Sequence, residues 1–253
     1  MPISFPSLKI LGGRVDRVSL EESLLFIEQN IAQDKFIQVI TVNALMLRET
    51  QRDGVLREVF ERAGLVVCDS VGVSLVGNLK KFSLPCRIPG IDLLLLLCKK
   101  AQEKSWPVYL VGAKPGIAER AKENLREKFP QLKISGSAHG YFDAEEEKRI
   151  LLDISSQKPR IVFVGLNIPF QEKWIDRNRA NFQGMCVMGV GGSFDVLSGN
   201  LIRAPTWIQT CGLEWLFRLI QEPWRWKRVF TIPPVLIKAA FAPSVISIPP
   251  RSD

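Results

Sequence analysis

Six short apolar runs, separated by segments with helical periodicity, constrain the fold of this chain more than any other feature. The runs cover residues 36–43, 65–70, 106–112, 132–142, 160–166 and 185–190. Buried strands that alternate with helices predict a parallel sheet with helices on both of its faces. The sequence therefore predicts an α/β fold with a Rossmann-like sheet, in which Val71 to Leu79 forms a glycine-rich apolar turn.

The segment after the sixth run, residues 184–203, predicts a strand end, a tight turn and the start of a helix. Its apolar residues give way to Gly191 and Gly192, and Asp195 follows at the start of the expected helix. Glycines let backbone N–H groups approach a ligand closely, and a helix N-terminus favours a phosphate. A nucleotide site with Asp195 as a hydrogen-bond acceptor is one interpretation, and a turn without a ligand is the other.

Polar side chains end two of the earlier apolar runs. Thr41 and Asn43 lie at the end of the first run, and Asp69 follows the second. Because the carboxyl ends of parallel strands line the ligand crevice of an open sheet, we expect these side chains to share that crevice. Each also has a structural explanation, since Thr41 and Asn43 could cap a strand and Asp69 could be a helix N-cap or turn residue.

The charge of the chain points to an anionic partner. Its formal net charge is +8 and its isoelectric point is near 9.4. Nucleic acid, a phosphorylated metabolite and a lipid surface would all fit this charge. The five cysteines are scattered singly and there is one histidine, so the sequence indicates a reducing compartment and neither a zinc site nor a disulfide framework.

The composition changes beyond Pro205. Four tryptophans lie among basic residues within positions 207–228. Tryptophan beside cationic side chains is typical of a segment at a membrane surface, while the alternative is a helix with its tryptophans buried against the domain. Single-stranded nucleic acid is a lesser alternative. The sequence thus predicts a Rossmann-like domain over residues 1–205 and a membrane-associating appendage over residues 206–253.

Several separated motifs, taken together, resemble the WecG/TagA/CpsF glycosyltransferases. They are TVN at 41–43, Asp69, R-x-x-G-x-D at 87–92, AHGYF at 138–142, GLNIPFQEKWI at 165–175, GVGGSFDVLSG at 189–199, RAP at 203–205 and GLEWLFRLIQEPWRW at 212–226. The members of this family are bacterial enzymes that transfer a sugar from a UDP donor to a polyprenyl-diphosphate-linked saccharide. The sugar is typically N-acetylmannosamine or its uronic acid, and the acceptor sugar is N-acetylglucosamine. The resemblance covers about residues 8–228.

The resemblance implies a role for each matched residue. Asp69 would be the catalytic base, with Thr41 beside it in the donor pocket. The same pocket would hold Asn43, Arg87, Gln171 and Asp195, the last in contact with the uridine. Three arginines of the C-terminal segment would close over the diphosphate when that segment settles at the membrane: Arg218, Arg225 and Arg228. Tyr141 is expected to stack on the uracil.

The resemblance also implies an inverting reaction on the cytoplasmic face of the bacterial membrane, with peripheral attachment and no cofactor. The chain has no D-x-D pair, with which many UDP-sugar enzymes hold a divalent metal. Arginines, which bind phosphate in a bidentate manner, are expected to replace the metal. The expected partners are the UDP-sugar donor, the polyprenyl-diphosphate-linked acceptor and an anionic membrane, without nucleic acid. The sequence leaves open whether the protein forms a homo-oligomer.

Two positions depart from the family pattern. Ser70 follows Asp69 where the family usually has glycine, and Asn167 replaces the second glycine of its GLGxPxQE motif. The first departure leaves open a non-catalytic module that binds a UDP-sugar at the membrane surface. A Rossmann-type oxidoreductase is a weaker alternative, because no G-x-G-x-x-G follows the first strand.

Overall fold

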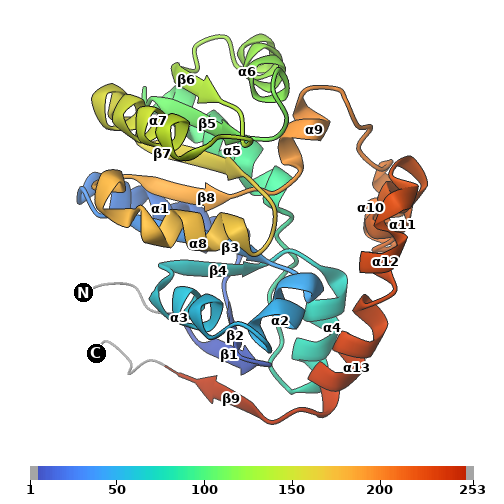
Figure 1. Ribbon diagram of the computed structural model, residues 1–253. Helices are drawn as coiled ribbons and strands as arrows, with labels where there is room; N and C mark the ends of the chain where they lie inside the picture. Colours follow the sequence, from blue (N-terminus) through green and yellow to red (C-terminus); the bar gives the residue numbers. More distant parts are fainter. Residues whose placement is uncertain (1–4, 249–253) are drawn as a thin grey trace.

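A six-stranded parallel sheet forms the centre of the computed structural model, which describes residues 5–248 (Figure 1). Its strands lie in the order β4-β3-β8-β7-β5-β6. They are β3 (Ile37–Val42), β4 (Leu65–Cys68), β5 (Val108–Gly112), β6 (Ile134–Ala138), β7 (Ile161–Gly165) and β8 (Cys186–Gly189). Each of the six apolar runs thus contains a strand, and all neighbouring pairs are parallel, which confirms the predicted Rossmann-like class.

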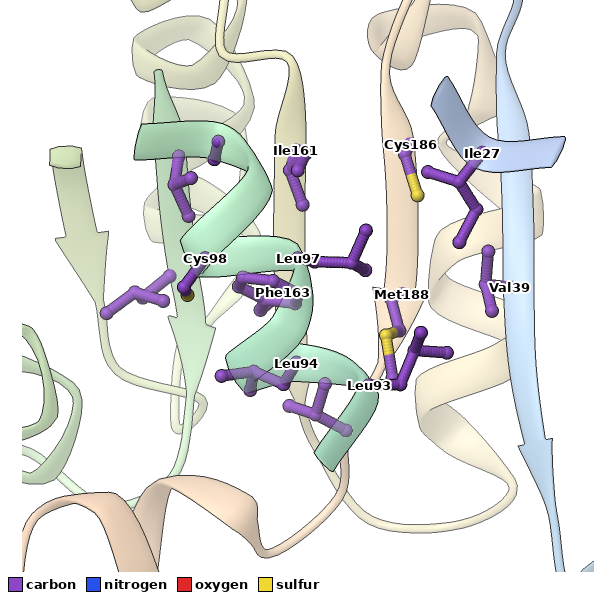
Figure 2. Close-up of a cluster of buried hydrophobic side chains, with 14 of the residues drawn as sticks. Ile27, Val39, Leu93, Leu94, Leu97, Cys98, Ile161, Phe163, Cys186 and Met188 are labelled. Atoms are coloured by element: carbon purple, nitrogen blue, oxygen red, sulfur yellow. The ribbon is translucent and has the colours of Figure 1, made fainter. Parts of the chain in front are cut away.

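Helices cover both faces of this sheet. They are α1 (Leu20–Ala32), α2 (Ala44–Thr50), α3 (Gly54–Arg62), α4 (Val71–Leu79), α5 (Gly90–Glu103), α6 (Ile117–Lys128), α7 (Ala144–Gln157), α8 (Phe170–Arg177) and α9 (Ser193–Leu197). On one face, α5 packs Leu93 and Leu97 against the sheet near Phe163 and Met188 (Figure 2). Apolar side chains alternate between the two faces of each strand, so the sheet is buried on both sides.

Local signals explain where two of the helices begin. Ser19 and Glu22 form the predicted capping box of α1, with each side chain bound to the backbone of the other.

The prediction of a turn from Val71 to Leu79 is wrong, because this segment forms α4 with Ser70 as its N-cap. Its Gly72 lies against the Leu236 side chain, so the glycine serves close helix packing.

A second, antiparallel sheet joins the two ends of the chain. It consists of β1 (Ser7–Ile10), β2 (Gly13–Asp16) and β9 (Ser244–Ser247), in the order β2-β1-β9. This sheet was not predicted from the sequence, because four-residue strands carry too little periodicity to be recognised. The C-terminal strand therefore pairs with the N-terminal one (Figure 1).

The C-terminal segment runs along the carboxyl edge of the main sheet before it reaches β9 (Figure 1). It contains α10 (Thr206–Thr210), α11 (Glu214–Gln221), α12 (Trp226–Val229) and α13 (Ile232–Phe241). Its tryptophans are exposed, at 66% for Trp207, 48% for Trp215, 71% for Trp224 and 50% for Trp226, which contradicts the alternative that they are buried. Over residues 5–248, no helix combines the length and apolar character that a membrane span requires.

Candidate active site

The strands β4, β3 and β8 are neighbours that end at one edge of the sheet, and the predicted residues follow them there. Asp69 comes directly after β4, Thr41 lies near the end of β3, and Gly191 and Gly192 follow β8. The Thr41 hydroxyl donates to the Gly189 carbonyl at 3.2 Å, which ties β3 to β8. These residues therefore gather at the carboxyl ends of adjacent strands, where open α/β sheets bind ligands.

The Asp69 carboxylate is fixed between β4 and α5. Its Oδ1 accepts a hydrogen bond from the Gly90 N–H at 3.0 Å, and within residues 5–248 no hydrogen bond reaches Oδ2. Burial raises the pKa of Asp69 to about 6. The Gly90 N–H and the positive charges of Arg87 and Arg218 act against this rise, while the charge of Glu214 adds to it. A carboxylate with such a pKa can accept a proton near neutral pH.

Thr41 and Asn43 both have structural roles. Thr41 is buried, and its hydroxyl is engaged with the Gly189 carbonyl. Asn43 is the N-cap of α2, and its Oδ1 accepts from the N–H groups of Leu45 and Met46 at 3.0 and 3.2 Å. Neither residue caps a strand as the structural alternative expected, since Thr41 lies within β3 and Asn43 caps a helix, and a functional role for both stays a prediction.

Gln171 lies beneath the glycine turn that follows β8. Its Oε1 accepts from the Leu166 N–H at 3.1 Å and from the Gly191 N–H at 2.9 Å, so it ties the end of β7 to the turn. Its Nε2 donates to Glu172 Oε1 at 2.6 Å. The Gln171 side chain is 1% exposed. Gln171 therefore positions the glycine turn. With its side chain buried and bonded in this way, it would act on a ligand through the turn and not by direct contact.

Sequence reasoning missed Glu172, which is 1% exposed on α8. One of its oxygens accepts from Gln171, while Oε2 is buried without a hydrogen-bond partner among the described residues. Burial raises the pKa of Glu172 to about 7, against the effect of the Gln171 hydrogen bond. An adjacent Gln-Glu pair in a first helical turn is not a local signal for burial, so only the tertiary structure shows this group.

One of the C-terminal arginines, Arg218, reaches the glycine turn. The Arg218 guanidinium occupies the space in which Gly192 would carry a side chain. Arg218 and Arg225 both bind Glu222 Oε2, each at 2.9 Å. Burial lowers the pKa of Arg225, and the charges of Arg218 and Arg228 act in the same direction. This crowding of like charges identifies a positive cluster at the rim of the crevice, which favours a polyanion.

Asp195 lies close to this positive cluster. It is half-buried in the first turn of α9, and its charge opposes the lowering of the Arg225 pKa. Tyr141 lies elsewhere, in the loop after β6, which is the strand at the opposite edge of the sheet from β4. Its side chain is 62% exposed. The structure thus brings Asp195 to the arginines but does not bring Tyr141 beside Asp69, and stacking of Tyr141 on uracil stays a prediction.

One ion pair connects the matched motifs to the C-terminal segment, and a second joins two of the motifs to each other. Arg87 Nη1 binds Glu214 Oε2 at 2.5 Å, which links the loop before α5 to α11. Arg203 binds both oxygens of Asp92 at 2.8 Å, so the RAP and R-x-x-G-x-D motifs contact each other directly. The Asp92–Arg203 pair shows that parts of these motifs hold the crevice together.

A Rossmann-like sheet with a buried carboxylate and an arginine cluster at its carboxyl edge is suited to an enzyme that acts on a phosphorylated substrate. Comparison with known proteins gives the family. The model described as "Glycosyl transferase WecG/TagA/CpsF family" matches residues 8–244. The chain therefore belongs to the WecG/TagA/CpsF family of glycosyltransferases, which excludes the oxidoreductase alternative.

Curated relatives share this similarity over most of their length. The chain is similar to an N-acetylglucosaminyldiphosphoundecaprenol N-acetyl-beta-D-mannosaminyltransferase of Bacillus subtilis (strain 168), with 34% identity over 82% of this chain and 81% of the relative. A protein of the same name from Bacillus spizizenii is 34% identical over 79% and 77% of the two chains. Another from Staphylococcus aureus (strain MW2) is 32% identical over 81% and 80%.

Proposed function

We propose that this enzyme transfers N-acetylmannosamine from UDP to N-acetylglucosamine on a polyprenyl diphosphate, with inversion and without a metal ion. The names of the relatives specify this sugar, a beta linkage and an undecaprenyl-diphosphate-linked acceptor. The observation that carries the proposal is that Asp69, after β4, and the glycine turn that Arg218 contacts, after β8, lie at the same edge of the sheet with only β3 between their strands. A base and a positive cluster in one crevice are what this transfer requires.

In the proposed reaction, a hydroxyl oxygen of the acceptor sugar attacks the anomeric carbon of the donor. Its proton passes to the carboxylate of Asp69, a new glycosidic C–O bond forms, and the bond from the anomeric carbon to the UDP phosphate oxygen breaks. UDP leaves with the electron pair of that bond. Because attack and departure take place on opposite faces of the sugar, an alpha-linked donor gives a beta-linked product.

The arginines supply the positive charge for the departing diphosphate. Arg218 lies against Gly192, and the charges of Arg218 and Arg228 both act on the pKa of Arg225. Charge-assisted hydrogen bonds from guanidinium groups to phosphate are strong and can be bidentate. They would stabilise the charge that develops on UDP, which is the task of the metal in enzymes with a D-x-D pair.

We place the enzyme at the cytoplasmic face of the membrane, attached through the segment 206–253. The exposed tryptophans and basic residues of α10 to α12 are suited to an anionic lipid surface. Because α11 also carries Arg218, binding of this segment to lipid would order the arginines where the acceptor resides.

Incubation of the purified enzyme with UDP-N-acetylmannosamine and a short-chain prenyl diphosphate N-acetylglucosamine tests the proposal. The expected product is the disaccharide on the prenyl diphosphate, with one UDP released per transfer and a beta linkage by NMR. The rate should not change when EDTA is added. Binding of UDP without any transfer would instead support the non-catalytic module, and a rate that returned only with added manganese would contradict metal independence.

A further inference from the structure

A pocket of about 410 Å³ lies between α4 and α10, next to Arg87. One wall is the first part of α4, with Val71, Ser74 and Leu75, and the other is α10, with Thr206 and Thr210. Its size is within the range of pockets that bind small ligands, about 300–1,000 Å³. None of the residues assigned to the donor in the proposed reaction, except Arg87, contributes to its walls.

The pocket is connected to the proposed base. Asp69 immediately precedes Ser70, the N-cap of α4, so α4 starts at the carboxylate and forms the pocket wall from there. Arg87 lines the pocket, and its charge also acts on the pKa of Asp69. The turn before α11 closes this side, because Gly212 packs against Val71. A ligand in the pocket would therefore lie beside Asp69.

The order of the strands separates the α4 wall of this pocket from the glycine turn. Asp69 ends β4, the outermost strand of the main sheet, while the turn follows β8, which is separated from β4 by β3. A displacement with inversion needs its nucleophile and its leaving group on opposite faces of the donor sugar. If UDP lies at the turn, the nucleophile must come from the side of β4 and α4.

The lining of the pocket fits a saccharide attached to a lipid. Ser74, Thr206, Thr210 and the guanidinium of Arg87 can exchange hydrogen bonds with sugar hydroxyls. Further along α4, Leu75 and Leu79 lie one helical turn apart, with exposed fractions of 58% and 70%. An apolar strip that leads out of a polar pocket matches a molecule with a sugar at one end and a hydrocarbon chain at the other.

We infer that the pocket between α4 and α10 binds the saccharide of the lipid-linked acceptor and presents its hydroxyl to Asp69. This inference rests on the proposed glycosyl transfer and adds to it the place of the acceptor. The polyprenyl chain leaves the pocket along Leu75 and Leu79 toward the membrane surface.

Thr210→Trp tests the inference, because it places a large side chain in the pocket from an exposed position at the end of α10. We expect the KM for the prenyl diphosphate N-acetylglucosamine to rise by at least about tenfold, while the Kd for UDP, measured by calorimetry, stays at the wild-type value. Ser74→Leu, on the opposite wall, should have the same effect. Ser156→Trp, at an exposed position on α7, is the matched control and should change neither constant.

The outcomes separate the two proposals. The thermal midpoints show whether both pocket variants are folded. If they are folded, the wild-type enzyme transfers the sugar and the acceptor KM is unchanged in both variants, the acceptor site is overturned and the proposed function is not. An equal rise in the Kd for UDP would also overturn it, because the pocket would then belong to the donor. If the wild-type enzyme bound UDP but transferred no sugar to the lipid-linked saccharide, the proposed function would fail and the acceptor site with it.

Discussion

The guanidinium of Arg218 lies so close to the backbone of Gly192 that a Cβ atom at position 192 would be 2.0 Å from Nη2. Glycine at this position is required by the approach of the arginine and not by its backbone angles, because its φ of −84° is accessible to any residue. The contact joins the turn after β8 to α11. The position of the Arg218 guanidinium therefore depends on the absence of a methyl group at residue 192.

Gly192→Ala should therefore displace Arg218 and impair catalysis without unfolding the protein. We expect kcat/KM to fall roughly 10- to 100-fold through misplacement of the charge. The free energy of unfolding should change by less than about 1 kcal/mol, because only the flexible end of a side chain must move. Gly54→Ala is the matched control, since its Cβ would meet Arg57 at an ordinary 3.5 Å. Equal activity in the two variants would disprove the role of the contact.

Asp69→Asn should abolish turnover while UDP still binds. General base catalysis contributes about 10²- to 10⁴-fold, so kcat should fall by that factor. Because burial raises the pKa of Asp69 to about 6 and the base acts in its deprotonated form, wild-type kcat/KM should rise with pH through 6 and then level off. Steady-state rates from pH 5 to 8 check this, and a flat profile would remove Asp69 from the role of base.

Gln171→Ala should destabilise the protein and weaken donor binding together. The substitution leaves the N–H groups of Leu166 and Gly191 without their acceptor, at about 1–3 kcal/mol for each group that stays buried and unpaired. The glycine turn would also lose its support, so the KM for the UDP-sugar should rise. Urea unfolding and donor kinetics measure the two effects. Gln157→Ala, at an exposed position, is the control. An equally small change in both variants would show that the Gln171 side chain does not support the glycine turn.

Glu172→Gln should make stability less dependent on pH. Burial raises the pKa of Glu172 to about 7, so the folded state binds this proton more tightly than the unfolded state does. The contribution of Glu172 to the free energy of unfolding is then fully present below pH 4.5, its ordinary pKa, and is lost as the pH rises through 7. The free energy of unfolding of the variant, relative to that of the wild type, should be higher at pH 8 than at pH 5. Glu127→Gln, exposed on α6, should show no such difference in thermal midpoints.

Replacement of exposed tryptophans tests membrane attachment more cleanly than truncation after Pro205. Truncation would remove β9, which pairs with β1, and α13, whose Val235 and Ala239 are buried. Trp224→Gln should lower binding to phosphatidylglycerol vesicles about tenfold, because the exposed ring that would insert into the lipid is lost. Leu152→Gln, 70% exposed on α7, is the control in the same co-sedimentation assay. Undiminished binding of the tryptophan variant would show that this ring does not enter the lipid.

Local patterns in the sequence determined the strands of the main sheet, the capping box of α1 and the glycine turn after β8. Burial periodicity and turn preferences act over a few residues, so they can be read along the chain. They also placed Asp69 and Thr41 at strand ends. The same reasoning failed at Val71 to Leu79, where two glycines suggested a turn, because Gly72 instead accommodates Leu236 from a distant helix.

Only the tertiary structure decided which of these residues meet. Arg87 and Glu214 are 127 positions apart, and the strand β9 pairs with β1 from the other end of the chain. The burial of Gln171 and Glu172, the approach of Arg218 to Gly192 and the pocket between α4 and α10 are likewise long-range. Such contacts depend on how helices and strands pack against one another, and no short stretch of sequence carries that information.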